Sequence, residues 1–130
     1  MFKVFNKIIP FKGFKGLTMW PFLFIRKGAT VTDTFERHEG THAKQQFEML
    51  CVGIVLTIIL FLVGCGWWSL FGLPIFYYWY GIEYIVRLFQ YQTFIAAYKN
   101  VAFEQEAYDH QNEIDYLDRR KPFAWVKYLK

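Results

Sequence analysis

Residues 38 to 42 read His-Glu-Gly-Thr-His, and residues of these types at this spacing could hold a metal ion and activate water. Side chains four positions apart lie on the same face of a helix, with Cβ atoms about 5–6 Å apart, so His38 and His42 can bind one zinc ion together. Glu39 is rotated away from both histidines and can reach a water molecule on the metal. Hydrolysis by an activated water needs this combination of two neutral nitrogen ligands and a free carboxylate base.

This spacing is the zinc motif of many metalloproteases, and the residues before it predict the helix that the motif requires. Asp33 is a suitable N-cap, and Glu36 three residues later would complete a capping box. We therefore expect a helix that begins near Thr34 and carries the motif in its first turns. Gly40 costs such a helix about 1 kcal/mol relative to alanine, a defect that a functional site explains better than stability does. The competing interpretation is a solvent-exposed helix with incidental histidines.

A catalytic zinc ion usually has three protein ligands and one open position, so a further ligand must come from elsewhere in the chain. Glu104 and Glu106 lie two residues apart, so on a helix they point to nearly opposite faces and only one of them can face the metal. The acidic and histidine candidates that follow the apolar part of the chain are Glu104, Glu106, Asp109, His110 and Glu113.

The apolar residues are concentrated in one stretch, which predicts the fold class. From Met49 to Ile82 the sequence has no Asp, Glu, Lys or Arg, and a Gly-Cys-Gly sequence interrupts it at residues 64–66. One spanning helix needs about 20 residues, so we expect a hairpin with arms over residues 49–63 and 69–82, each extended by flanking helix. The expected fold class is an all-α membrane protein: a transmembrane helical hairpin with long helices extending to one face, a short N-terminal extended segment and amphipathic ends. The alternative is a buried core hairpin, but so small a chain could not cover that much apolar surface.

The charged residues predict how the chain lies in the membrane. All 15 Lys and Arg residues lie outside the apolar stretch, so the positive-inside rule puts both termini and the metal motif on the cytoplasmic side of a cell membrane crossed more than once. The net charge of +4 fits attraction to an anionic leaflet. No nucleic-acid-binding motif is present. The expected partners are therefore the lipid bilayer and a polypeptide substrate, not nucleic acid.

The whole chain, residues 1–130, is expected to form a single membrane-embedded domain. Its expected parts are a basic and aromatic interfacial segment (1–30), the motif helix that runs into the first membrane arm (34–63), the second arm with the third-ligand helix (68–118) and an interfacial tail (122–130). Residues 18–27 read as a short extended piece, which Pro21 would restrict to the edge of a sheet. An edge strand beside the motif helix could bind a peptide by strand addition. A loop that touches the membrane is the alternative.

Two pairs of residues near the apolar stretch are also informative. Glu83 and Arg87 have opposite charges four residues apart, where the second arm should leave the membrane. We interpret them as an interfacial salt bridge, with a role in the metal site as the alternative. Cys51 and Cys65 would lie near opposite ends of the hairpin, too far apart for a disulfide.

The order of these motifs resembles that of the membrane-embedded gluzincins, among them the CAAX prenyl proteases and the HtpX-like proteases. These families have His-Glu-x-x-His, a membrane hairpin and then Glu-x-x-Ala-Asp on a later helix, and the first Glu of the later motif is the third zinc ligand. Glu104-Gln105-Glu106-Ala107-Tyr108 stands at the corresponding place. The resemblance implies a zinc-dependent metallopeptidase in which Glu104 completes the site.

One position departs from the gluzincin pattern. Tyr108 stands where those families have the Asp that usually orients a histidine ligand, and Asp109 follows one residue later. Either Tyr108 or Asp109 takes that role, or the register shifts and Glu106 is the ligand. His110 is a further candidate.

A second resemblance covers most of the chain. Small membrane proteins of Bacteroidetes bacteria also have His-Glu-x-x-His followed by Gln-Gln, at residues 45–46 here, and a later Phe-Glu-x-Glu-Ala-Tyr, at residues 103–108 here. The gluzincin resemblance, in contrast, covers only the two motifs and their order.

These motifs predict a mechanism. Zinc held by His38, His42 and Glu104 would lower the pKa of a bound water towards about 7. Glu39 would take the proton, the hydroxide would attack a peptide carbonyl, and Glu39 would pass the proton to the leaving amine. The expected substrate is a membrane-anchored or membrane-adjacent polypeptide, because the motif lies close to the point where the hairpin enters the bilayer.

The sequence leaves open which residue stabilises the tetrahedral intermediate, for which Arg37, Tyr108 and His110 are candidates. It also leaves two other functions open. One is a non-catalytic membrane interaction or scaffold protein. The other is a zinc hydrolase that acts on a lipid or an envelope component, because a fold-level analogy does not exclude it.

Overall fold

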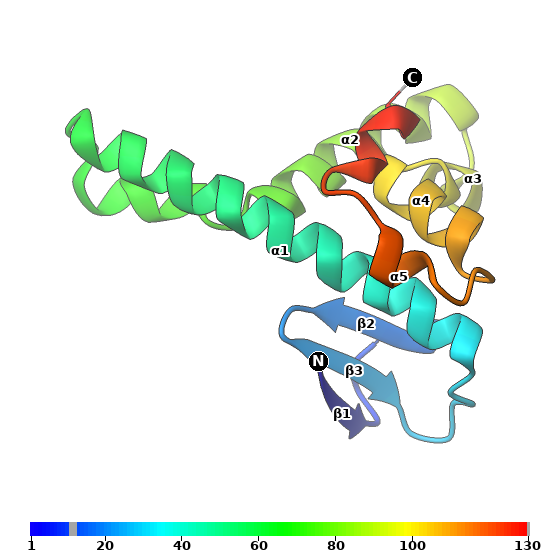
Figure 1. Ribbon diagram of the computed structural model, residues 1–130. Coiled ribbons are helices and arrows are strands. Elements are labelled where there is room, and N and C mark those ends of the chain that lie inside the picture. Colours follow the sequence, from blue (N-terminus) through cyan, green and yellow to red (C-terminus); the bar gives the residue numbers. More distant parts are fainter. Residues whose placement is uncertain (11–12, 130) are drawn as a thin grey trace.

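A three-stranded sheet lies beside the N-terminal half of a long helix in the computed structural model, which describes residues 1–10 and 13–129 (Figure 1). Strand β3 (Phe22–Arg26) is central, with β1 (Phe2–Asn6) parallel to it on one side and β2 (Gly16–Met19) antiparallel on the other. The predicted all-α fold class is therefore wrong, because the protein combines helices with a mixed sheet.

The strands form because their residues alternate between two faces. Leu23 and Ile25 of β3 are fully buried, whereas Phe22 is exposed. Pro21 lies in the connection between β2 and β3, where its missing N–H leaves no strand hydrogen bond unmade. The extended piece predicted over residues 18–27 is thus two strands. Their third partner, β1, comes from residues that the lysines and aromatics had indicated as an interfacial segment.

Helix α1 (Asp33–Leu62) starts over the sheet and ends far from it (Figure 1). Its N-cap is Thr32, whose hydroxyl oxygen accepts a hydrogen bond of 3.2 Å from a backbone N–H of the first turn. The predicted cap at Asp33 is therefore one residue too late. Glu36, predicted to complete a capping box, instead pairs with Lys3 of β1 and joins the helix to the sheet.

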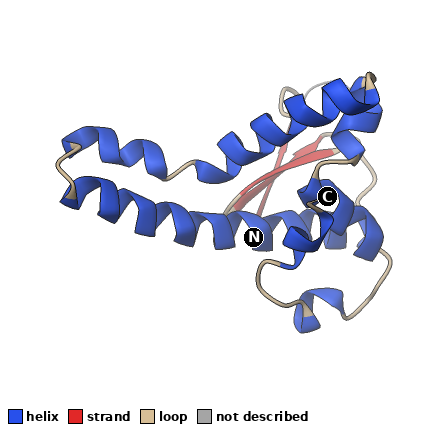
Figure 2. Cartoon of the chain, turned by 90° about the horizontal axis from the view of Figure 1, so that it is seen from above, coloured by secondary structure: helices blue, strands red, loops and turns tan. Residues whose placement is uncertain are grey.

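The chain turns after α1 and returns beside it as a 3₁₀ helix, η1 (Gly66–Gly72), and then α2 (Ile75–Tyr91), as Figure 2 shows. Among the described residues, α1 is the one helix that is long and apolar enough to cross a membrane. The predicted hairpin of two long spanning helices is therefore wrong. Its returning arm is broken around Gly72 and Pro74, residues that disfavour the interior of an α-helix.

The two arms lie in close backbone contact. A Cβ atom added to Gly53 of α1 would come within 2.7 Å of the carbonyl oxygen of Leu73 and 2.8 Å of that of Gly72. Gly53 is therefore needed for the returning arm to approach α1 this closely.

The rest of the described chain forms short helices: α3 (Phe94–Lys99), α4 (Ala102–His110), α5 (Tyr116–Arg119) and the 3₁₀ helix η2 (Ala124–Tyr128). Their core is built around Phe103, whose ring centroid lies 4.6 Å from that of Phe76 and 4.5 Å from that of Trp125. In the tail predicted to lie on a membrane surface, Trp125 is buried in this core, whereas Phe123, Val126 and Leu129 are exposed.

Candidate metal centre

Three side chains from two helices converge where α4 crosses α1. The Nε2 atoms of His38 and His42 lie 3.2 Å apart. The carboxylate of Glu104 lies 3.4 Å from the first of them and 3.3 Å from the second. Ligand atoms about 2.0–2.1 Å from one ion at tetrahedral angles lie about 3.3–3.4 Å from each other. The three atoms therefore have the spacing of one face of a tetrahedral metal site.

The burial of these side chains also fits a bound cation. The side chains of His38 and His42 are each 9% exposed and that of Glu104 is 4% exposed. Within the described residues, Oε2 of Glu104 is buried without a hydrogen-bond partner, and its distance to His38 is beyond a good hydrogen bond. A buried carboxylate oxygen in this state is costly, and a metal ion between the three side chains would satisfy it.

The metal-free cluster is held together by charge. Burial lowers the pKa of His42, but the charge of Glu104 and its hydrogen bond outweigh burial and raise that pKa to about 9. Burial raises the pKa of Glu104, but the two histidines outweigh it and bring the pKa well below its usual value. A metal ion would have to displace a proton from this cluster to bind.

Glu83 of α2 positions the helix that carries Glu104. Its carboxylate oxygen accepts a hydrogen bond of 2.8 Å from the N–H of Ala102, in the first turn of α4, and lies 3.5 Å from Arg87. Both charged side chains are buried. The pair interpreted as an interfacial salt bridge therefore lies at the N-terminus of α4 and contacts the backbone two residues before the metal ligand.

The other predicted ligand candidates point elsewhere. Glu106 is fully buried, but its carboxylate accepts hydrogen bonds from Gln45 of α1 and from Tyr116 of α5. Asp109 is exposed. His110 lies 2.7 Å from the Glu113 carboxylate and stacks on a neighbouring tyrosine ring. The metal group contains Glu104 and none of these four.

The Glu39 side chain faces the sheet rather than α4, the helix that carries Glu104. Its Oε2 accepts a hydrogen bond of 2.6 Å from the hydroxyl of Thr18 in β2, and both side chains are buried. The strand thus orients the carboxylate that the motif predicts as the general base. The sequence did not indicate Thr18 itself, although it predicted an extended piece at this position.

An open cavity of about 340 Å³ lies beside the site. His38 and Glu39 form part of its wall, and Tyr98 and Tyr108 form another part. The Tyr108 ring packs against that of His38, with centroids 4.6 Å apart. The remaining wall comes from the start of β2 and the loop before it, from the N-terminal end of α1 and from the residue after α4: Gly13, Phe14, Lys15, Gly16, Thr32, Thr34, Phe35 and Gln111.

Three tyrosines surround the third ligand, and the sequence did not indicate two of them, Tyr80 and Tyr98. The hydroxyl of Tyr80 donates to Oε1 of Glu104 at 3.0 Å. Burial, followed by the charge of Glu104, raises the pKa of Tyr98, and burial raises that of Tyr108 in the same way. These hydroxyls therefore keep their protons and act as hydrogen-bond donors. Of the residues predicted to stabilise an intermediate, Tyr108 lines the cavity, whereas Arg37 donates to a carbonyl oxygen of the loop after α4.

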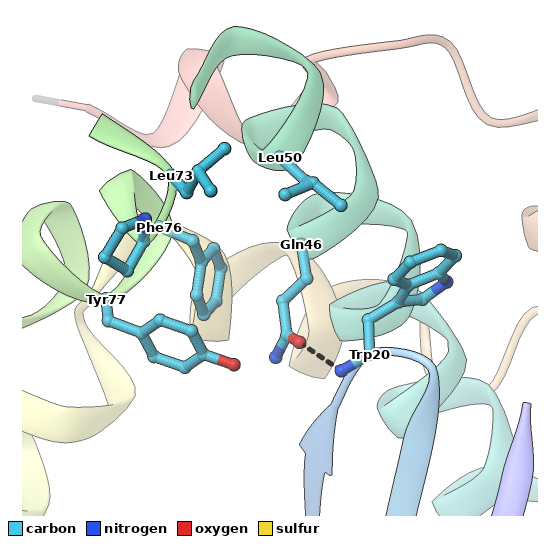
Figure 3. Close-up of a pocket in the computed structure, with 7 residues that line it drawn as sticks. Trp20, Gln46, Leu50, Leu73, Phe76 and Tyr77 are labelled. Carbon is cyan, nitrogen blue, oxygen red and sulfur yellow. Dashed lines mark hydrogen bonds between the residues drawn. The ribbon is translucent and has the colours of Figure 1, made fainter. Parts of the chain in front are cut away.

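Two packing contacts fix α1 against its neighbours. Gln46 accepts a hydrogen bond from the N–H of Trp20 and donates to the carbonyl oxygen of Thr18, each at 2.7 Å, beside a small apolar cavity of about 70 Å³ (Figure 3). A Cβ atom added to Gly40 would come within 2.8 Å of the Leu117 side chain. The helix-disfavouring glycine in the motif therefore lets α5 lie against α1.

The chain matches no protein-family model, no curated protein and no solved structure. The resemblance to membrane-embedded gluzincins therefore stays a prediction, and the function has to be argued from the geometry of the site.

Proposed function

We propose that this protein is a zinc-dependent metallopeptidase whose metal ligands are His38, His42 and Glu104. The observation that carries the proposal is the mutual distance of the three ligand atoms, 3.2 to 3.4 Å. Imidazole nitrogens favour zinc over calcium or magnesium, which take oxygen ligands. Among zinc reactions, the His-Glu-x-x-His motif favours peptide hydrolysis.

The mechanism uses the side chains on both sides of the cavity. Zinc bound at this site would acidify a water molecule and polarise a substrate carbonyl. Glu39 would serve as the proton acceptor for that water and then as the proton donor to the leaving amine, and Thr18 holds its carboxylate in place. Tyr98 and Tyr108 line the same cavity, so their hydroxyls are the donors available to the developing oxyanion.

The edge of β2 favours an extended polypeptide as substrate. The N–H of Arg26 donates to the carbonyl oxygen of Lys15 at 2.9 Å, so Lys15 and, two residues on, Leu17 direct their backbone groups to β3. The backbone groups of Gly16 then point away from β3, and Gly16 lines the cavity beside Glu39. A substrate strand could therefore pair with Gly16, whereas the next outward carbonyl of β2, that of Thr18, is taken by Gln46 of α1.

The surface of α1 favours a substrate that is anchored in or lies next to a lipid bilayer. Beyond Lys44 every exposed residue of α1 is apolar, and η1 and most of α2 continue this surface. We propose that this surface contacts the bilayer, with the site on the cytoplasmic side, where the positive-inside rule puts the basic residues. The exposed residues of α1 are Phe47, Cys51, Val52, Ile54, Val55, Ile58, Ile59, Phe61 and Leu62.

The test compares two carboxylates of the same helix in the detergent-solubilised full-length protein. Glu39→Gln should bind one zinc ion per chain but lose chelator-sensitive cleavage of a peptide mixture by about 10²–10⁴-fold. Glu36→Gln is the matched control, because Glu36 is exposed and pairs with Lys3, and it should cleave like the wild type. Equal cleavage by Glu39→Gln and the wild type, or a wild type without stoichiometric zinc, would reject the proposal.

A further inference from the structure

A row of buried hydrogen bonds leads from His42 to the C-terminal segment of the chain. Nδ1 of His42 lies 2.9 Å from Oε1 of Gln45. Nε2 of Gln45 lies 2.9 Å from the carbonyl oxygen of Phe103 and 3.0 Å from Oε2 of Glu106. Gln45 and Glu106 are both fully buried, so water does not compete for these contacts.

These contacts determine the orientation of the Gln45 amide. The carbonyl oxygen of Phe103 can only accept a hydrogen bond, and Oε2 of Glu106 already accepts one from the guanidinium of Arg120. The amide NH₂ must therefore face them, and its oxygen must face His42. Nδ1 of His42 then donates, which leaves Nε2 as the atom that faces His38 and Glu104.

Glu106 is held in turn by residues beyond α4. The hydroxyl of Tyr116 donates to Oε1 of Glu106 at 2.7 Å, and the guanidinium of Arg120 donates to the same carboxylate. Arg120 also donates to Glu48 of α1, whose carboxylate accepts a further bond of 3.1 Å from the N–H of Phe123. The Arg120 side chain is 2% exposed. Through Glu48 and Glu106 it therefore joins the two helices that carry the metal ligands.

We propose that Gln45, Glu106 and Arg120 are positioning residues of the metal centre. Gln45 selects the His42 nitrogen that faces the metal, Glu106 fixes Gln45, and Arg120 sets the separation of α1 and α4. Metal affinity therefore depends on a C-terminal arginine whose described partners are carboxylates outside the ligand group. This inference rests on the metal site of the proposed function but not on peptide hydrolysis.

The first test measures zinc affinity by competition with a chromogenic chelator, with the full-length protein in detergent. Gln45→Met keeps the length of the side chain and removes its hydrogen bonds, and it should weaken zinc binding by about 10–100-fold, as loss of a ligand's orienting partner usually does. Gln46→Met is the matched control: it removes the two hydrogen bonds of the neighbouring buried glutamine, which go to the backbone of Thr18 and Trp20, so zinc affinity should stay within about twofold of the wild type.

The second test changes Arg120, at the other end of the row of hydrogen bonds, without removing its charge. Arg120→Lys keeps the positive charge that Glu48 and Glu106 need but loses the planar fork that joins both carboxylates. It should weaken zinc binding, whereas Arg119→Lys, at an exposed pair with Glu113 and Asp115, should not. Cobalt substituted for zinc gives the spectroscopic readout: its visible absorption bands should shift in Gln45→Met and Arg120→Lys and stay unchanged in both controls.

The outcomes separate this inference from the proposed function. Wild-type zinc affinity and an unchanged cobalt spectrum in Gln45→Met and Arg120→Lys would overturn the inference alone. Equal losses in Gln45→Met and Gln46→Met, with matching losses of thermal stability, would also overturn it, because the residues would then act only through folding. A wild type that binds neither zinc nor cobalt would overturn both the inference and the proposed function.

Discussion

The two halves of α1 differ in which side chains they bury and which they expose. In the half over the sheet, the buried residues are polar or charged, among them His38, Glu39, His42 and Gln45. In the half that extends from the sheet, the exposed residues are apolar from Val52 onward. Soluble proteins normally show the reverse in both respects, with apolar residues inside and isolated charges outside.

The difference indicates that the two halves are adapted to different surroundings. Buried polar groups are stable only when each has a partner, and in the first half most of these partners come from β2, α4 and the C-terminal segment. A large exposed apolar surface marks a contact with another apolar phase. Changes in the first half should therefore act by leaving a polar group without its partner, and changes in the second half by altering contact with lipid.

The largest effect is expected from Arg120→Met, which leaves the carboxylates of Glu48 and Glu106 buried without their cation. Breaking a buried ion pair in this way costs about 3–5 kcal/mol of unfolding free energy. Denaturant unfolding of the detergent-solubilised protein measures it. Arg119→Met, which removes an arginine that is 55% exposed, should cost less than about 1 kcal/mol.

The opposite order of the two arginine variants would contradict the importance of the buried pair. Equal destabilisation by both would indicate that Glu48 and Glu106 find other partners or take up protons when Arg120 is removed.

The next effect is a pH dependence of the metal-free protein. Folding raises the pKa of His42 from 6.5 to about 9. The contribution of protonated His42 to the unfolding free energy is therefore complete below pH 6.5 and is lost as the pH rises through 9. Folding lowers the pKa of Glu104, so its contribution is present above pH 4.5, its usual pKa, and is lost as the pH falls. Between pH 6.5 and 9 the metal-free protein should lose about 3 kcal/mol of unfolding free energy.

Thermal unfolding in the presence of a chelator, at pH 6 and at pH 9, measures this loss. Zinc binding should follow the opposite trend and tighten over the same range, because the metal competes with the proton on His42. A metal-free protein equally stable at both pH values would contradict the ion pair between His42 and Glu104.

The comparison of the two halves also explains which features could be predicted from the sequence. The relation of His38 to His42 is local, since residues four apart on any helix share a face. The choice of Glu104 over Glu106 used the resemblance to another family, together with the opposite directions of residues two apart. The structure brings Glu104 to the histidines and directs Glu106 to Gln45.

The features that the sequence did not reveal are non-local. Strand β1 pairs in parallel with β3, with Phe2 opposite Phe22, and a parallel pair has no turn sequence that indicates it. Gln45 and Arg120 acquire their roles only when α4 and the C-terminal segment pack on α1. The alternating lysines and aromatics of residues 1–16 also fit a segment on a membrane surface, so the composition alone did not distinguish that segment from a strand.

In the apolar half, Ile59→Arg should weaken membrane association. Ile59 is 51% exposed on the outer part of α1, and an arginine at the centre of a membrane helix costs about 2.5–3.5 kcal/mol. Flotation with lipid vesicles measures the bound fraction. Ile114→Arg is the control, because Ile114 is 86% exposed but lies in the loop before α5. If both variants float like the wild type, the apolar surface of α1 does not contact lipid.

The smallest effect concerns the contact between the two arms. Gly53→Ala would put a Cβ atom within 2.7 Å of backbone that cannot move aside as a side chain can, so it should cost about 1–3 kcal/mol of unfolding free energy. Gly81→Ala in α2 has open space around it and should gain up to about 1 kcal/mol from helix propensity. Denaturant unfolding of both variants measures the difference. Both variants replace glycine by alanine. If Gly53→Ala lowers the unfolding free energy and Gly81→Ala raises it, the loss comes from the backbone contact between the arms. If both raise it equally, the arms separate when the protein is in detergent.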